Sequence, residues 1–137
     1  MVSLNIDIIP VLVMAVVSMI IGFLWYSQAL FGKPWMKLSK INPNKVKKKN
    51  KSMAGPMIWA FIATLVLVGT LSSIINLLGI NTALGGLGIG FCLWLGFIAT
   101  TMLNGILWEC KPVALYLINV THYLVVLAVS GIVLAVF

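Results

Sequence analysis

Four long runs of apolar residues dominate the chain, over about residues 8–30, 57–78, 84–108 and 113–137. A helix needs roughly 20 apolar residues to cross a hydrocarbon core of about 30 Å, and each run is long enough. Backbone that faces lipid must satisfy its own hydrogen bonds, so the runs predict helices rather than irregular chain. We therefore expect an all-α, polytopic membrane protein. Its four transmembrane helices should form an antiparallel bundle, as a single transmembrane domain over residues 1–137.

Short motifs mark the ends of these runs. Lys33-Pro34 follows the first run and Lys111-Pro112 follows the third, and the residue before a proline is biased away from the helical conformation. Gly86 and Gly90 stand four residues apart at the start of the third run, a spacing typical of close contact between membrane helices. The pattern predicts that small residues of the third span face a neighbouring helix.

Charge is concentrated in one segment. Eight of the nine lysines lie between Lys33 and Lys51, and the chain has a formal net charge of +7. Only 8% of the residues are charged and 62% are hydrophobic, whereas soluble proteins average about a quarter charged residues. Cytoplasmic loops carry an excess of lysine and arginine. We therefore expect a multi-pass protein of the plasma membrane, with the Lys-rich loop over residues 32–55 in the cytoplasm and both termini extracytoplasmic.

The basic end of this loop is a candidate contact for anionic lipid headgroups, since each lysine near a membrane surface contributes roughly 1 kcal/mol. Its lysines are Lys45, Lys47, Lys48, Lys49 and Lys51. Anchoring of the topology alone also explains them. We expect no nucleic-acid partner, because this end of the loop lacks the arginines or aromatic residues on which bases stack.

A few polar or ionisable residues fall within the spans or at their cytoplasmic ends. They are Trp25, Tyr26, Asn104, Glu109, Asn119 and His122. Counting 1.5 Å per residue from the lysine-rich side places His122 about 15 Å deep and Asn119 about 10 Å deep. We expect these six residues to form one ligand-binding or pore-lining cluster in the cytoplasmic half of the bundle, because intramembrane ionisable groups are functional candidates by default. The alternative is that they only join helices through hydrogen bonds.

We expect no cofactor and no metal site. Glu109, Cys110 and His122 lack the short spacing of metal ligands, and Asp7 is expected on the opposite side of the membrane from Glu109, which leaves no Ser-His-Asp set. The glycine-rich stretch over 85–90 has no Walker lysine. No residue is therefore singled out as catalytic.

Two early motifs resemble a known family. Gly22-Phe23-Leu24-Trp25-Tyr26-Ser27 and Phe31-Gly32-Lys33-Pro34-Trp35-Met36 are similar to the opening signature of the DUF1761 family of small prokaryotic membrane proteins. The Glu109-Cys110-Lys111-Pro112 turn and residues 119–123 resemble the later part of that family, so the resemblance covers nearly the whole chain. It implies a four-span protein with no established biochemical activity.

Three functions stay open at this point. The first is a homo-oligomeric unit that binds or conducts a small solute or an ion, with the small residues of the third span offering a packing face. The second is a structural or accessory subunit whose polar residues only specify helix packing. The third is a membrane-embedded enzyme that uses His122 and Glu109, although their expected depths differ by about 15 Å.

Overall fold

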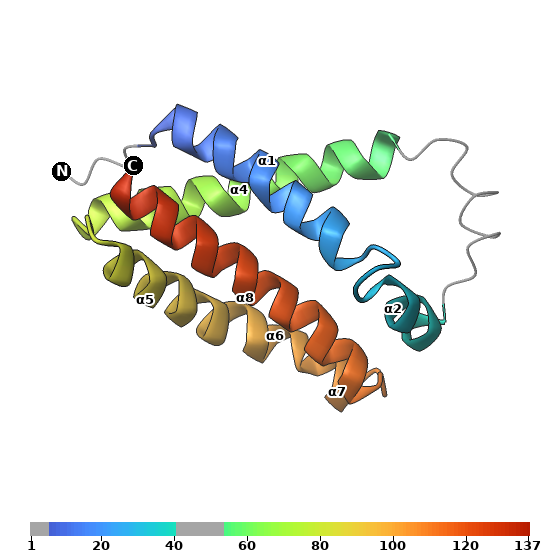
Figure 1. Cartoon of the computed structure of the whole chain (residues 1–137). Coiled ribbons are helices and arrows are strands. Elements are labelled where there is room, and N and C mark those ends of the chain that lie inside the picture. The colour runs from blue at the N-terminus through green and yellow to red at the C-terminus, as the bar shows by residue number, and fades with distance from the viewer. Residues whose placement is uncertain (1–5, 41–53) are drawn as a thin grey trace.

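The computed structural model describes residues 6–40 and 54–137, which form helices joined by short turns (Figure 1). The helices are α1 (Ile8–Trp25), α2 (Gly32–Ser39), α4 (Ala54–Leu77), α5 (Ala83–Leu93), η1 (Trp94–Ala99), α6 (Thr100–Met102), α7 (Asn104–Leu107) and α8 (Val113–Val136). The lysines expected to contact anionic lipid, Lys45 to Lys51, lie outside the described residues. The prediction of an all-α fold is confirmed for the part of the chain that is described.

Four stretches are long and apolar enough to cross a membrane: α1, α4, the stretch from α5 to α7, and α8. They run back and forth, so that α1 begins and α8 ends at one end of the bundle, while α2 and the turn before α8 lie at the other (Figure 1). Helix α8 is the central element, because it contacts α1, α4 and α5. The predicted antiparallel bundle of four transmembrane helices is confirmed.

The first crossing is shorter than its apolar run suggested, because α1 ends at Trp25 rather than near residue 30. The chain then reverses, and the Gly32 N–H donates to the Ser27 carbonyl over 2.9 Å. A Cβ atom on Gly32 would overlap the carbonyl oxygen of Tyr26, so the turn needs glycine here. Hydropathy alone does not separate this tight turn from a further turn of helix.

The third crossing is not a uniform α-helix. Residues Trp94–Ala99 form a π-helix, which leaves backbone carbonyls out of the usual ladder. The Tyr116 hydroxyl of α8 donates to the Ala99 carbonyl over 2.8 Å, and the Trp94 indole N–H donates to the Val120 carbonyl over 2.7 Å. The irregular turn is thus held from α8 at both of its ends.

Helices α5 and α8 approach each other closely. A Cβ atom on Gly86 would overlap the Gly131 carbonyl oxygen, and one on Gly90 would overlap the Leu127 carbonyl oxygen. The prediction that Gly86 and Gly90 serve close helix contact is confirmed. Their partner is α8 of the same chain, so this face is already occupied and does not offer a surface to a second copy.

The bundle is tightly closed near the end that carries the start of α1. Met14, Val68, Leu71 and Ile75 are almost fully buried there and pack together with Leu127. The first turns of α4, residues 54–60, are exposed instead, and this end of α4 diverges from α8 (Figure 1). The four helices are therefore closely packed at one end and open at the other.

Candidate functional site

A cavity of about 540 Å³ lies between α1, α4 and α8, where α4 diverges. Helix α1 contributes Ser18, Gly22 and Tyr26, which are spaced by four residues and therefore share one face of the helix. Helix α8 contributes His122 and Tyr123. The remaining walls are mostly apolar and come from Met19, Phe23, Ala60, Ala63, Thr64, Leu67 and Val126.

The His122 ring stands among aromatic side chains. Its centroid lies 5.2 Å from that of Tyr26, 5.0 Å from that of Tyr123 and 6.2 Å from that of Trp25. Both ring nitrogens are buried, yet neither has a hydrogen-bond partner within residues 6–40 and 54–137. The imidazole is therefore positioned by ring packing, and the described residues leave both of its nitrogens without a hydrogen bond.

Ser18, on the α1 side of the cavity, also has a buried polar atom without a hydrogen-bond partner. Its side chain is 4% exposed, and its hydroxyl oxygen finds no partner in the described part of the chain. An unsatisfied buried polar group costs about 1–3 kcal/mol, and a hydroxyl in a helix readily bonds to a nearby carbonyl. Two such groups in one cavity, the His122–Ser18 pair, are unusual enough to mark it as a site.

Gly22 lies one helical turn after Ser18 on α1 and faces His122 of α8, and its lack of a side chain keeps the cavity open. A Cβ atom at this position would lie 3.5 Å from Nε2 of His122, which is ordinary van der Waals contact. Alanine would therefore fit, whereas a larger side chain would extend over the imidazole into the cavity. Gly22 is the point at which the site can be filled by substitution.

Two hydrogen bonds fix α1 against α8 beside the cavity. The Tyr26 hydroxyl donates to Oδ1 of Asn119 over 2.8 Å, and the Trp25 indole N–H donates to the Ile118 carbonyl over 3.0 Å. The hydroxyl and the indole N–H thus have hydrogen-bond partners, and these bonds connect the two helices. Of the six residues expected in one cluster, Trp25, Tyr26, Asn119 and His122 are brought together.

The other two expected residues line a second cavity, of about 260 Å³, nearer the lysine-rich end. Asn104 and Glu109 lie there with Asn119, and the Glu109 carboxylate forms an ion pair of 2.7 Å with Lys111. His122 does not line this cavity. The expected single cluster is therefore divided, and the acid–base pair of His122 and Glu109 gains no geometric support.

Ser18 was missed from the sequence because serine is common in membrane helices. A signal was present nonetheless, since Ser18, Gly22 and Tyr26 follow each other at intervals of one helical turn.

The described residues contain no group of three or more histidine, cysteine, aspartate or glutamate side chains that could hold a metal ion.

Of three comparisons with known proteins, only the one with protein-family models gives a match. Neither the curated proteins nor the solved structures include a match to it. The family model described as "Protein of unknown function (DUF1761)" matches residues 9–135, which is nearly the whole chain and includes both cavities. The chain thus belongs to the DUF1761 family of proteins of unknown function.

Proposed function

We propose that the protein binds a small, mainly apolar molecule within the membrane, in the cavity between α1, α4 and α8. The observation that carries the proposal is the His122–Ser18 pair. The ring nitrogens of half-buried His122 and the hydroxyl of Ser18 are buried, both residues line one cavity, and these atoms find no partner in residues 6–40 and 54–137. A bound hydroxyl or carbonyl group would satisfy both, which would offset the cost of keeping them buried.

The chemistry of the pair limits the ligand. A serine hydroxyl both donates and accepts a hydrogen bond, and a neutral imidazole donates from one nitrogen and accepts at the other. The pair therefore suits an alcohol, which donates and accepts, or a ketone or quinone-like carbonyl, which accepts. Apolar walls such as Met19, Leu67 and Val126 suit a hydrocarbon body, and about 540 Å³ lies within the usual range of ligand pockets.

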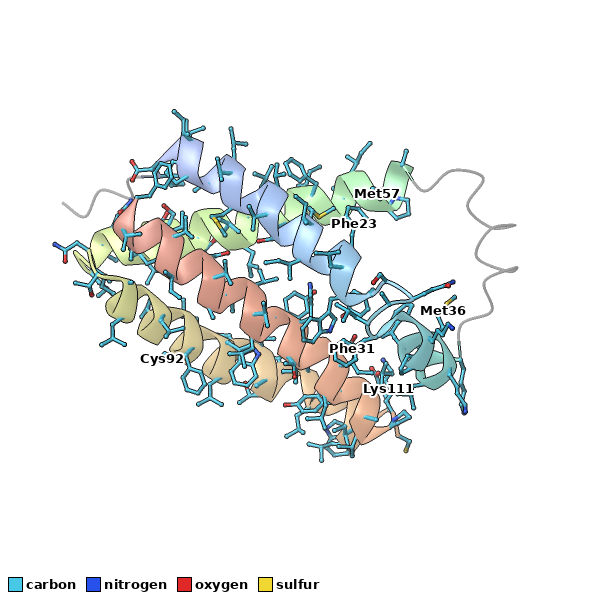
Figure 2. The ribbon with its side chains drawn as sticks, viewed as in Figure 1. Phe23, Phe31, Met36, Met57, Cys92 and Lys111 are labelled. Atoms are coloured by element: carbon cyan, nitrogen blue, oxygen red, sulfur yellow. The ribbon has the colours of Figure 1, made fainter. Side chains whose placement is uncertain are left out.

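Access from the bilayer supports a hydrophobic ligand. Phe23, Ala60 and Ala63 line the cavity and are exposed on the side that a membrane would cover. Phe23 and Met57 lie next to each other along α1 and α4, where the two helices begin to separate (Figure 2). A molecule dissolved in lipid would enter between these helices without passing through water.

Binding is better supported than conduction by a single copy. Beyond His122 the bundle is filled by Met14, Leu71 and Ile75, each at most 2% exposed. These side chains close the cavity within the membrane, although Ser72, Ser73 and Ser130 are also buried in the bundle. A homo-oligomeric pore would have to form on another surface, since Gly86 and Gly90 already pack against α8.

A purely structural role is the second candidate, and the Tyr26–Asn119 and Trp25–Ile118 hydrogen bonds support it for those residues. Interhelical joints of this kind contribute about 1 kcal/mol each. The role does not extend to the His122–Ser18 pair, because a joint requires a partner and the described residues supply none.

The histidine provides a direct test, because it is the only one in the chain. The protein, labelled with ¹⁵N-histidine in lipid nanodiscs, is titrated with 1-decanol and with 2-decanone while the imidazole resonances are recorded. We expect a saturable shift with at least one probe in the wild type. Gly22→Leu should abolish the shift, and Gly88→Leu should leave it unchanged, because Gly88 is exposed and faces open space as far as the described residues extend.

The outcomes separate binding from simple partition. A shift that rises linearly with probe concentration and is identical in Gly22→Leu would mean that the probe only dissolves in the bilayer, and the proposal would fail. Absence of any shift with both probes would also reject a site for alcohols and ketones.

We propose further that the lysine-rich end faces the cytoplasm. Lys33 and Lys37 belong to α2, and Lys40 follows its last residue. Lys111 lies at the same end of the bundle, which supports this orientation. Cys110 is exposed there, whereas Cys92 is exposed on the outer side of α5 (Figure 2). A membrane-impermeant maleimide should label Cys110 in inside-out vesicles only and Cys92 in neither orientation. Labelling of Cys110 in intact cells would reverse the topology.

A further inference from the structure

Helix α2 lies beside the start of α8 at the lysine-rich end of the bundle (Figure 1). Aromatic contacts hold it there: the Phe31 ring lies 4.7 Å from the Trp25 ring, and the Trp35 ring lies 5.5 Å from the Tyr26 ring, measured between centroids. Figure 2 shows Phe31 and Lys111 at this end of the bundle. An amphipathic helix fixed beyond the end of a span belongs at the level of lipid headgroups.

A cavity of about 430 Å³ lies between α2 and the turn that precedes α8. From α2 and its end it is lined by Trp35, Ser39 and Lys40, and from the turn by Glu109 and Lys111. It is separate from the His122–Ser18 cavity, with which it shares no lining residue. Two lysines and a tryptophan thus share one pocket, which the apolar residues Leu38, Pro112 and Leu115 also line.

Positive charge is in excess around this pocket. Lys111 is paired with Glu109 over 2.7 Å, and both side chains are more than half exposed. Within residues 6–40 and 54–137, Lys40 forms no ion pair with a carboxylate. Lys33 and Lys37 of α2 are two further exposed cations, and neither lines the pocket. An anion that enters would meet Lys40 directly and would share Lys111 with Glu109.

The backbone is also unusual at this pocket. Lys40 and Cys110 adopt left-handed conformations, with φ of 56° and 54°, and they are the two non-glycine residues in the described ranges with positive φ. Both line the pocket. Such conformations cost of order 1 kcal/mol each and concentrate at binding sites, where the surrounding structure holds them.

We propose that this pocket binds the phosphate-bearing headgroup of an anionic phospholipid, with Lys40 and Lys111 contacting the phosphate and Trp35 packing beside the glycerol region. The lipid chains would continue along the apolar surface of the bundle. This site is independent of the His122–Ser18 cavity, and its lysines differ from the loop lysines discussed above.

Native mass spectrometry of the purified full chain tests the proposal. The detergent-solubilised protein is titrated with phosphatidylglycerol and with phosphatidylcholine of the same chain composition. We expect phosphatidylglycerol to bind preferentially, and Lys40→Gln with Lys111→Gln to weaken it by about fivefold for each lysine removed. The matched control, Lys33→Gln with Lys37→Gln, removes the same charge from outside the pocket and should weaken binding by less than threefold in total.

A third variant acts in the opposite direction. Glu109→Gln frees Lys111 from its ion pair and removes the competing carboxylate, so it should strengthen phosphatidylglycerol binding. A circular dichroism melt of each variant checks that the fold is retained, and a gain of binding in Glu109→Gln cannot arise from unfolding.

Several results would overturn the proposal. Equal losses in the two lysine double variants would assign the effect to diffuse surface charge. An unchanged affinity in Glu109→Gln would remove the pocket from the explanation. Displacement of the lipid by millimolar inorganic phosphate would identify a soluble phosphate site rather than a headgroup site.

Discussion

The α5–α8 pair and the α1–α4 pair use the same central helix in different ways. Between α5 and α8 the glycines bring backbone against backbone, and polar side chains such as Trp94 are hydrogen-bonded to carbonyls of the opposite helix. Between α1, α4 and α8 the side chains leave a cavity of about 540 Å³, and both residues of the His122–Ser18 pair line it. One side of α8 is closely packed, and the other side borders a cavity.

Close packing on one side of α8 allows a small membrane protein to keep unpartnered polar groups on the other side. The tightly packed α5–α8 pair stabilises the bundle enough to tolerate unsatisfied polar groups on the opposite side of α8. Functional sites commonly lower stability in this way. Substitutions at the α5–α8 glycines and at the His122–Ser18 pair should therefore change stability with opposite sign.

The largest change in stability is expected for a substitution at Gly86. An alanine Cβ atom would overlap the Gly131 carbonyl oxygen and lie 2.7 Å from the Ala135 Cβ atom, so the helices must separate. We expect Gly86→Ala to lower the free energy of unfolding by about 3 kcal/mol, measured by circular dichroism in mixed micelles titrated with a denaturing detergent. Gly88→Ala is the control and should be neutral or slightly stabilising, because its position is exposed. Equal losses in both variants would contradict the close approach.

Substitutions at the His122–Ser18 pair are expected to raise the free energy of unfolding instead of lowering it. Replacing a buried polar group that lacks a partner with an apolar one of similar size removes its desolvation cost. We expect Ser18→Ala and His122→Leu each to raise the free energy of unfolding of the ligand-free protein by about 1 kcal/mol. The same unfolding titration measures it. A loss of stability in both variants would show that the pair is a packing element, and the comparison between the two sides would not stand.

A smaller loss is expected where α8 holds the π-helix. Tyr116→Phe removes the hydrogen bond to the Ala99 carbonyl and should lower the free energy of unfolding by about 1 kcal/mol. Tyr123→Phe serves as the matched control, since its side chain is partly exposed and should change stability little. An effect as large in Tyr123→Phe would mean that Tyr116 has no special role in this turn.

The smallest effect is expected for the joint between α1 and α8. A double-mutant cycle with Tyr26→Phe and Asn119→Leu should give a coupling energy of about 0.6 kcal/mol, the usual size for such bonds in membrane proteins. A coupling near zero would place Tyr26 and Asn119 with the His122–Ser18 pair, as groups that do not join helices.

Most of the fold could be predicted because lipid imposes a simple rule on composition. The four apolar runs correspond to four crossings, and the spacing of Gly86 and Gly90 identified a real contact face. The end of α1 at Trp25 could not be predicted, since the turn from Tyr26 to Phe31 contains the same apolar and aromatic residues as a helix end. It depends on Gly32 meeting the backbone of that turn.

The candidate site was predictable only in part. Counting residues from the lysine-rich side brought Tyr26, Asn119 and His122 to similar depths, and the structure joins them through a hydrogen bond and a ring contact. Depth does not reveal which of these groups has a partner. That distinction depends on side-chain geometry across three helices, and it separates His122 from Asn119 and adds Ser18 to the site.

The π-helix at Trp94–Ala99 also sets a length requirement on the third crossing. A π turn contains one residue more than the α turn it replaces, and each residue of an α-helix advances the helix face by about 100°. The π turn takes up this extra residue, so that Gly86 and Gly90, which meet α8, keep their phase relative to Asn104, which borders the cavity with Glu109. If the same residues formed an ordinary α-helix, Asn104 would be rotated by about 100° relative to the two glycines.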